Sequence, residues 1–123
     1  MASYLILMIL LHIIDDFVLQ TKSLANLKQK KWWKKQKLEN PTQYKDDYLC
    51  ALFIHGLSWS AMVHIPFLFV YYNDLILILS FISQAIIHAI IDNKKANKGE
   101  INLIEDQAMH LVQLMVIWLT FTM

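Results

Sequence analysis

Apolar residues along this chain fall into four long blocks that are separated by short polar segments. The blocks run roughly from Tyr4 to Leu19, from Tyr48 to Tyr72, from Leu75 to Ile91 and from Ile101 to Met123. A helix needs about 17–25 mainly apolar residues to cross the ~30 Å hydrocarbon core of a bilayer. The pattern therefore predicts an all-α, integral membrane four-helix bundle. It forms a single transmembrane domain over residues 1–123, with spans at about 3–20, 48–72, 74–92 and 101–123.

A secretory signal peptide is the alternative interpretation of the first block. Its start, Met1-Ala2-Ser3, contains no lysine. Asp15 and Asp16 stand where a signal peptide would have its small-residue cleavage site. We therefore expect the first block to be a retained helix.

The composition agrees with long membrane helices. Hydrophobic residues make up 57% of the chain and charged residues 17%, whereas soluble domains have about 45–50% and about 25%. Two glycines and two prolines argue against a turn-rich β domain. The single cysteine, Cys50, excludes an internal disulfide framework, and we interpret it as a packing residue.

The basic residues are sorted between the connections of the predicted spans. All 11 are lysines; Lys94, Lys95 and Lys98 follow the third block, and the other eight lie within residues 21–47. The connection from Tyr71 to Asp74 has none. Because Lys-rich loops stay on the cytoplasmic side, we expect both of these loops to be cytoplasmic and both termini to lie outside.

Residues 21–47 form a basic cytoplasmic loop for which we predict a short interfacial helix. Trp32 and Trp33 suit the membrane interface, where nearby lysines can reach anionic lipid. A basic segment with tryptophans is also compatible with nucleic acid. Since this one lies between two spans, we expect the lipid bilayer as partner and no nucleic acid.

Each block also contains ionisable residues, which are costly inside a membrane and usually face the bundle interior. Three blocks repeat a His/Asp spacing of four residues, which puts both side chains on one helix face. The pairs are His12 with Asp16, His88 with Asp92, and Asp106 with His110. With His55 they lie within ~13 Å of the predicted cytoplasmic ends, so we expect them to form one polar layer.

Imidazole and carboxylate groups in a helix bundle are suitable ligands for zinc, iron or manganese. We predict a site for a divalent metal, with zinc favoured and iron or manganese as alternatives. The predicted ligands are His12, Asp16, His55, His88, Asp92, Asp106 and His110. Asp15, Gln20 and Gln107 are expected to support these ligands by hydrogen bonds. The alternative is a His–Asp network that only fixes helix packing.

His64 does not belong to this predicted layer. It follows His55 by nine residues, which puts it on the opposite helix face. We interpret His64 as a packing residue.

The run from His12 to Gln20, His-Ile-Ile-Asp-Asp-Phe-Val-Leu-Gln, resembles the His-x-x-x-Asp-Phe-x-Leu-Gln signature of a family of small bacterial and phage membrane proteins. This family is called domain of unknown function 3307. Its other motifs resemble His55-Gly56, His88-x-x-Ile91-Asp92 with Lys95, and Asp106-Gln107-x-x-His110, in the same order. The family often has a second histidine one turn after the His55 position, where this chain has Trp59. The resemblance covers nearly the whole chain. It implies a multi-pass protein of the bacterial inner membrane, of phage or prophage origin, without assigning a reaction.

The polar layout is also similar to that of membrane-bound metal-dependent hydrolases. We therefore predict a hydrolase that acts on a lipid-linked or membrane-associated substrate at the cytoplasmic leaflet. Asp16 and Asp92 are catalytic candidates, as ligands or general bases, and Lys95 is a third that would orient an anionic group together with Gln107.

Two other functions remain open from the sequence. Buried His and Asp residues also suit a proton or metal-ion transporter or channel. The third candidate is a non-catalytic phage effector that binds a host membrane protein. We expect short spans of this kind to favour a homo-oligomer. The chain has no Gly-rich phosphate loop, no Gly-x-Ser-x-Gly motif and no Cys–His pairing.

Overall fold

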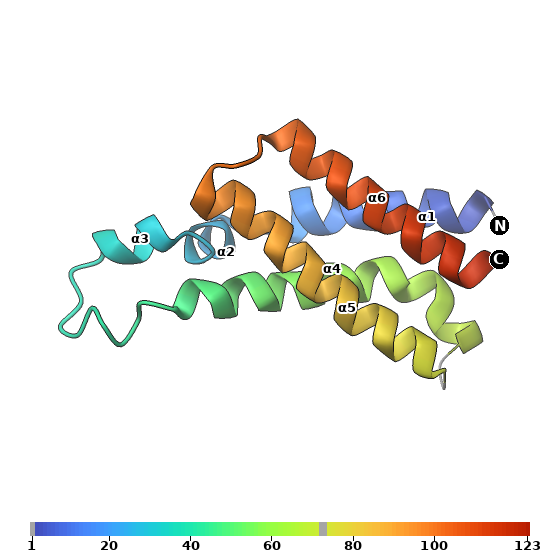
Figure 1. Cartoon of the computed structure of the whole chain (residues 1–123), viewed down its shortest axis with the longest axis horizontal. Coiled ribbons are helices and arrows are strands. Elements are labelled where there is room, and N and C mark those ends of the chain that lie inside the picture. The colour runs from blue at the N-terminus through green and yellow to red at the C-terminus, as the bar shows by residue number, and fades with distance from the viewer. Residues whose placement is uncertain (1, 72–73) are drawn as a thin grey trace.

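Four long helical segments carry the four apolar blocks (Figure 1). The computed structural model describes residues 2–71 and 74–123, and it contains helices but no strand in these two ranges. The prediction of an all-α chain is confirmed for them. Tyr72, the predicted end of the second span, and Asn73 in the following connection lie outside the described residues.

The first helix, α1 (Ala2–Ile13), continues into a π-helical turn, η1 (Ile14–Leu19). Two short helices follow in the basic segment, α2 (Lys22–Leu27) and α3 (Lys30–Lys35), where the sequence predicted one. The other long helices are α4 (Asp47–Tyr71), α5 (Leu75–Asn93) and α6 (Leu103–Thr122). A second π-helical turn, η2 (Lys94–Lys98), extends α5.

Local sequence signals set several helix ends. The Thr21 hydroxyl caps α2 by accepting a hydrogen bond of 3.2 Å from the backbone N–H of Leu24. Asn102 and Glu105 form a capping box at the start of α6. Gly99 ends η2 in the left-handed conformation, with φ of 66°, which glycine adopts without strain.

Helices α4 and α5 pack on each other, and α1 and α6 complete the assembly. The N- and C-terminal ends lie together, away from α2 and α3 (Figure 1). The apolar core occupies this terminal half of the molecule. It consists of Met8, Trp59, Val63, Phe67, Leu77, Leu114, Ile117 and Phe121.

Three helical segments are long and apolar enough to cross a membrane. They are Ala2–Leu19, Asp47–Tyr71 and Leu75–Lys98. Helix α6, the fourth predicted span, is not among the segments that meet this criterion in the described part of the chain. Its first half carries Glu105, Asp106, Gln107 and His110, which make its composition more polar.

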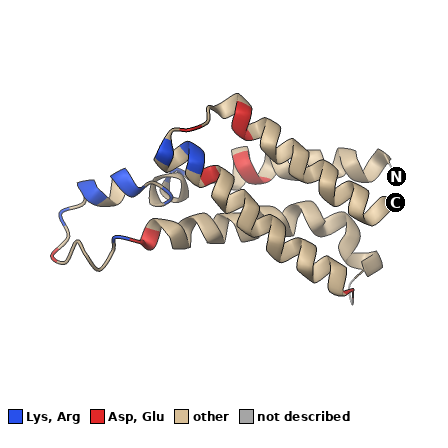
Figure 2. Cartoon of the chain, viewed as in Figure 1, with Lys and Arg blue, Asp and Glu red and all other residues tan. Residues whose placement is uncertain are grey.

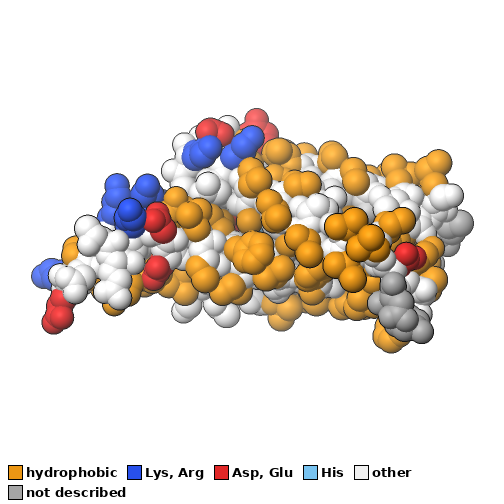
Figure 3. Space-filling model, turned by 60° about the horizontal axis from the view of Figure 1, so that its bottom comes forward, with side chains coloured by type: hydrophobic (Ala, Val, Ile, Leu, Met, Phe, Trp, Pro, Cys, Tyr) orange, Lys and Arg blue, Asp and Glu red, His pale blue; other side chains and the backbone are white. Residues whose placement is uncertain are grey.

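Polar and apolar surfaces are separated along the long axis. Apolar side chains cover much of the face shown in Figure 3. Lysines gather at the end formed by α2, α3 and η2, whereas the helices toward the termini are almost free of charge (Figure 2).

Gly56 allows the closest approach between α4 and α5. A Cβ atom at this position would overlap the carbonyl oxygen of Ala85 and lie 3.5 Å from the Cβ of Ala89. These alanines flank His88 in α5, and His55 precedes Gly56 in α4. The absent side chain therefore lets the two histidine rings come within 5.1 Å, measured between centroids.

Replacing Gly56 with alanine should destabilise the protein, although alanine has the higher helix propensity by about 1 kcal/mol. The overlap involves backbone atoms that cannot rotate away, and overpacking of this kind costs about 1–3 kcal/mol. Thermal unfolding in detergent should show a lower midpoint for G56A than for the wild type. The control is A61L, which adds volume at an exposed position of the same helix. An unchanged midpoint for G56A would mean that the helices are not this close.

Candidate metal centre

Side chains from four helical segments converge on one buried centre near the lysine-rich end. We call this set the His/Asp cluster; it comprises His12, Asp15, Asp16, His55, His88, Asp92, Asp106 and His110. All of these residues are buried except Asp16, whose side chain is 9% exposed. The structure thus brings together all seven residues predicted as ligands, and it adds Asp15.

His88 lies in the middle of the cluster. Its Nε2 atom is 4.0 Å from Oδ1 of Asp16 and 3.9 Å from Oδ1 of Asp92. The Nε2 atom of His55 lies 3.4 Å from Asp16 Oδ1 and 3.5 Å from Asp92 Oδ2. Two carboxylates from η1 and α5 are therefore shared by two imidazoles from α4 and α5.

Two groups of side chains place one ligand atom each within 4.8 Å of one another. They are Asp16, His55 and His88, and His88, Asp92 and His110. Zinc with bonds of ~2.0–2.1 Å to tetrahedral ligands holds those ligand atoms about 3.3 Å apart. The separations of 3.4–4.0 Å in the cluster are therefore close to the size of a zinc site. Because both groups contain His88, they form one contiguous centre.

The hydrogen bonds of His110 determine which ring nitrogen faces the cluster with a lone pair. Gln113 donates through Nε2 to Gln84, to its backbone oxygen at 3.1 Å and its side-chain oxygen at 2.9 Å. The Gln113 side-chain oxygen must then accept, at 3.1 Å, from Nδ1 of His110. In the neutral ring, Nε2 consequently carries a lone pair, which faces carboxylate oxygens of Asp92 and Asp106, each at 3.5 Å.

Several atoms at this centre are buried without a hydrogen-bond partner. Within residues 2–71 and 74–123, neither ring nitrogen of His88 has one. The others are Asp15 Oδ2, Asp16 Oδ1, Asp106 Oδ1 and His110 Nε2. Leaving buried polar atoms unpaired costs about 1–3 kcal/mol each, and more when they are charged. A cation between them would satisfy several at once.

Two lysines contact the cluster from the lysine-rich end of the molecule. Lys28 is buried at the end of α2, and its ammonium donates to Asp92 Oδ2 at 2.5 Å and to the side-chain oxygen of Gln20 at 2.7 Å. Lys95, from η2, donates to Oδ2 of Asp106. The sequence predicted Lys28 only as one of the eight lysines of the basic loop 21–47, and no local pattern distinguishes it from the other seven. Gln20, predicted to support a ligand, instead binds Lys28.

The charges of the cluster do not balance within the described chain. Asp15, Asp16, Asp92 and Asp106 supply four carboxylates, and two ammonium groups pair with them. The carboxylates therefore outnumber the ammonium groups by two, and positive charge from protonated histidines or from a bound cation must balance this difference. One divalent cation would neutralise it.

His12, a predicted ligand, lies beside the centre with both ring nitrogens engaged. The indole N–H of Trp59 donates to Nδ1 of His12 at 2.7 Å. Nε2 must then carry the proton and donate to the side-chain oxygen of Gln107, at 3.1 Å. The Trp59 ring also stacks on His88, with centroids 4.4 Å apart. Trp59 is therefore part of the site, although the sequence marked it only as the position where related proteins often have a histidine.

Asp15 and Gln107 contact the candidate ligands from the periphery. Asp15 accepts a hydrogen bond of 2.7 Å from the Ser58 hydroxyl, and its other oxygen lies 3.7 Å from Nδ1 of His55. A carboxylate behind an imidazole is a common way to orient a histidine ligand. Gln107 donates to Asp106 at 3.1 Å and to Asp16 at 3.4 Å.

The π-helical turn η1 carries Asp15 and Asp16, which lie on different sides of His55. In this turn the backbone N–H of Gln20 donates a hydrogen bond of 3.0 Å to the carbonyl of Asp15, five residues earlier. Single π-helical turns are frequent at functional sites because they change which side chains face inward. Here the turn lets two consecutive carboxylates reach one imidazole.

The remaining predicted residues lie away from the cluster. His64 bonds to the Ser60 carbonyl at 2.8 Å and to the Ser80 hydroxyl at 2.9 Å. Trp32 and Trp33 lie in α3 and contact each other edge to face. Cys50 is exposed on α4 rather than packed in the interior, so that interpretation was wrong.

Comparison with known proteins supplies a family. The model of a family described as "Protein of unknown function (DUF3307)" matches residues 4–123. No curated protein and no solved structure matches the chain.

Replacing Lys28 with methionine should destabilise the protein strongly. Removing one partner of a buried ion pair costs about 3–5 kcal/mol, because the other charge stays buried and unpaired. Thermal unfolding in detergent should show a much lower midpoint for K28M than for K22M, which alters an exposed lysine of the same helix. The double variant K28M/D92N should recover part of the loss. Equal midpoints for K28M and K22M would contradict the buried pair.

Proposed function

The chain belongs to the DUF3307 family, and we propose that it is a membrane-embedded, metal-dependent hydrolase. It would bind a divalent ion, zinc foremost, in the His/Asp cluster and act on a lipid-linked or membrane-associated substrate at the cytoplasmic leaflet. One observation carries this proposal: ligand-type atoms from η1, α4, α5 and α6 converge in a buried space, and those on η1, α5 and α6 include several without a hydrogen-bond partner in the described chain.

Insertion in a membrane is supported by the outer surface of all four long helical segments. Large apolar side chains are exposed along them, for example Ile6, Phe53, Ile78 and Val112. Exposed apolar areas of this extent mark a membrane or protein interface. In α6, Asp106, His110 and Gln113 are buried, whereas Leu111, Val112 and Val116 are exposed. We therefore propose α6 as the fourth span, because Asp106, His110 and Gln113 face the protein and Glu105 lies in its first turn.

The orientation follows from the lysines. They gather at the end formed by α2, α3 and η2 (Figure 2), and such residues are retained on the cytoplasmic side. In this orientation both termini lie outside, and the His/Asp cluster lies in the cytoplasmic half of the membrane.

The ligands that the geometry favours are His55, His88 and His110 with Asp16 and Asp92. A divalent ion with an open coordination position would supply the Lewis acid for hydrolysis. Asp16 is the cluster residue that keeps some exposure, and Lys95 beside Asp106 has a side chain that is 33% exposed. We propose that substrate approaches there. Asp16 would then act as ligand or general base, and Lys95 would orient an anionic group.

A transporter is the weaker candidate because the interior of the terminal half is mainly apolar, and its buried His64 is occupied by hydrogen bonds to Ser60 and Ser80. The core around Val63, Phe67 and Phe121 fills the space between the cluster and that end. Ions crossing a membrane need polar groups or water along their path. In the described chain, polar groups reach the cluster from the lysine-rich end, through Lys28 and Lys95.

Metal analysis tests the proposed centre directly. Protein purified in detergent without chelator should contain about one divalent ion per chain by elemental mass spectrometry, because one such ion neutralises the cluster. H88A should lose it, since His88 belongs to both candidate ligand groups. H64A removes a buried histidine outside the cluster and should retain it. A folded wild type that neither contains nor takes up zinc, iron or manganese would refute the metal centre.

Transport can be separated from hydrolysis in proteoliposomes. We expect no zinc or proton flux above that of empty liposomes, measured with entrapped fluorescent indicators, because the apolar core closes one end. D74N, outside the cluster, serves as the control for D16N. A flux that D16N abolishes and D74N preserves would favour the transporter instead.

A further inference from the structure

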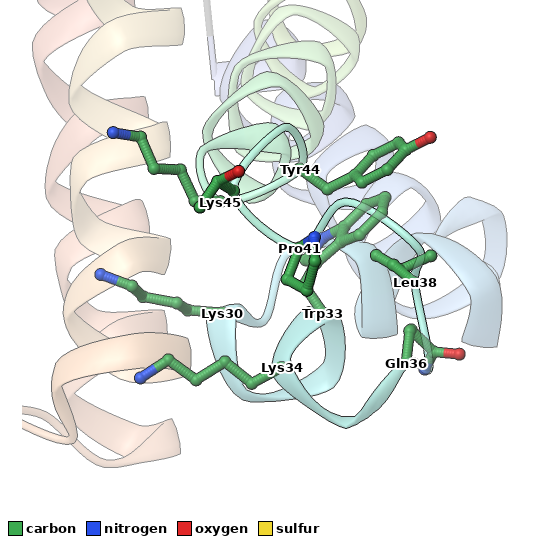
Figure 4. Close-up of a pocket in the computed structure, with 9 residues that line it drawn as sticks. Lys30, Trp33, Lys34, Gln36, Leu38, Pro41, Tyr44 and Lys45 are labelled. Atoms are coloured by element: carbon green, nitrogen blue, oxygen red, sulfur yellow. The ribbon is translucent and has the colours of Figure 1, made fainter.

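A basic hollow lies beside α3, outside the His/Asp cluster (Figure 4). It has a volume of about 270 Å³, and we call it the basic hollow. Its lining includes Lys30 and Lys34 of α3, Lys45 before α4, and the rings of Trp33, Pro41 and Tyr44.

The three lysines make the hollow electropositive. Lys30 and Lys34 lie one helical turn apart, and Figure 4 shows the amino groups of all three extended toward the same side. In the described chain, no carboxylate lies within 4.0 Å of the ammonium of Lys30 or Lys34. The neighbour of Lys45 is the exposed Asp46, at 3.9 Å. The Lys30 ammonium also lies over the Tyr48 ring, 5.7 Å from its centroid. With one exposed carboxylate beside three ammonium groups, the positive charge left over favours an anion at the hollow.

The aromatic wall of the hollow is held by specific contacts. Trp33 and Tyr44 stack, with ring planes 7° apart and centroids at 6.1 Å. The indole N–H of Trp33 donates to the Leu27 carbonyl at 2.9 Å. Asn97 of η2 accepts from the backbone N–H of Lys30 at 2.6 Å and donates to the Lys28 carbonyl at 2.9 Å. These bonds fasten α3 to both neighbouring helices.

An apolar groove adjoins the basic hollow, and Trp33 lines both. The groove has a volume of about 320 Å³ and includes Leu24, Leu27 and Ile54 in its lining. A charged hollow and an apolar groove on either side of one tryptophan match a molecule with an anionic head and a hydrocarbon tail.

We propose that the basic hollow binds the phosphate-bearing head group of an anionic phospholipid, with an acyl chain along the groove lined by Leu24, Leu27 and Ile54. The head group would form charge-assisted hydrogen bonds with Lys30, Lys34 and Lys45. A volume of about 270 Å³ exceeds what a bare phosphate needs and can hold a glycerophosphate group. The site does not depend on metal in the His/Asp cluster.

Native mass spectrometry of the full chain in detergent tests this site. Phosphatidylglycerol should bind with a Kd at least about tenfold lower than phosphatidylcholine, because each lysine near an anionic surface contributes about 1 kcal/mol. The variant K30Q/K34Q/K45Q should lose this preference. K22Q/K35Q/K37Q removes the same charge from lysines outside the hollow and should keep it. The variant I54N, in the groove, should weaken both lipids.

Each other outcome overturns the proposal. Equal losses in the two lysine variants would show diffuse attraction to the basic segment rather than a site. Soluble glycerophosphate or inorganic phosphate that displaces the lipid at equal concentration would show a ligand without a tail. The thermal unfolding midpoint and the metal content of each variant report whether it is folded, independently of lipid.

Discussion

The rest of this structure depends on one electrostatic constraint. Buried nitrogen and carboxylate oxygen atoms face one another with their lone pairs, and this arrangement needs positive charge to be stable. His88 and His110 direct ring nitrogens at carboxylate oxygens, and those oxygens belong to residues that are themselves buried. In a medium of low dielectric constant, such an arrangement is stable only with positive charge between the atoms. Protons on the histidines could supply it, as could one divalent ion. The ion also satisfies the unpaired Asp16 and Asp106 oxygens, which is why we favour it.

The surrounding fold holds these imidazole and carboxylate groups close to one another. Gly56 lets α4 approach α5 until the rings of His55 and His88 are in contact. The η1 turn presents two successive carboxylates to His55. Lys28 and Lys95 reduce the negative charge from one end, and the apolar core insulates the other. The result is a polar centre whose two lysine ion pairs both come from the lysine-rich end.

Much of this arrangement was predictable because it is local. The spacing of four residues puts His88 with Asp92 and Asp106 with His110 on single helix faces, whatever the rest of the chain does. The long helices were also predictable, because each follows from one continuous block of apolar residues. Lys28 was not predictable, because its burial requires α2 to pack against α4 so that Lys28 reaches Asp92 of α5, and sequence spacing carries no sign of that. The same holds for His12, whose ring nitrogens are engaged only because Trp59 and Gln107 come from two other helices.

The basic segment shows why eight similar lysines need not have similar roles. Lys28 ends α2, and the extended backbone of Gln29, with φ of −101° and ψ of 117°, reverses the side-chain direction before α3 begins. Lys28 therefore points into the protein, where its charge stabilises Asp92, and Lys30 and Lys34 line the basic hollow outside. Asn97 fixes the backbone on both sides of Gln29, because its side chain donates to the Lys28 carbonyl and accepts from the Lys30 N–H. The positive-inside rule counts these charges equally, but the lysines differ in burial. The buried Lys28 contributes to the stability of the cluster, whereas Lys30 and Lys34 remain available to a ligand.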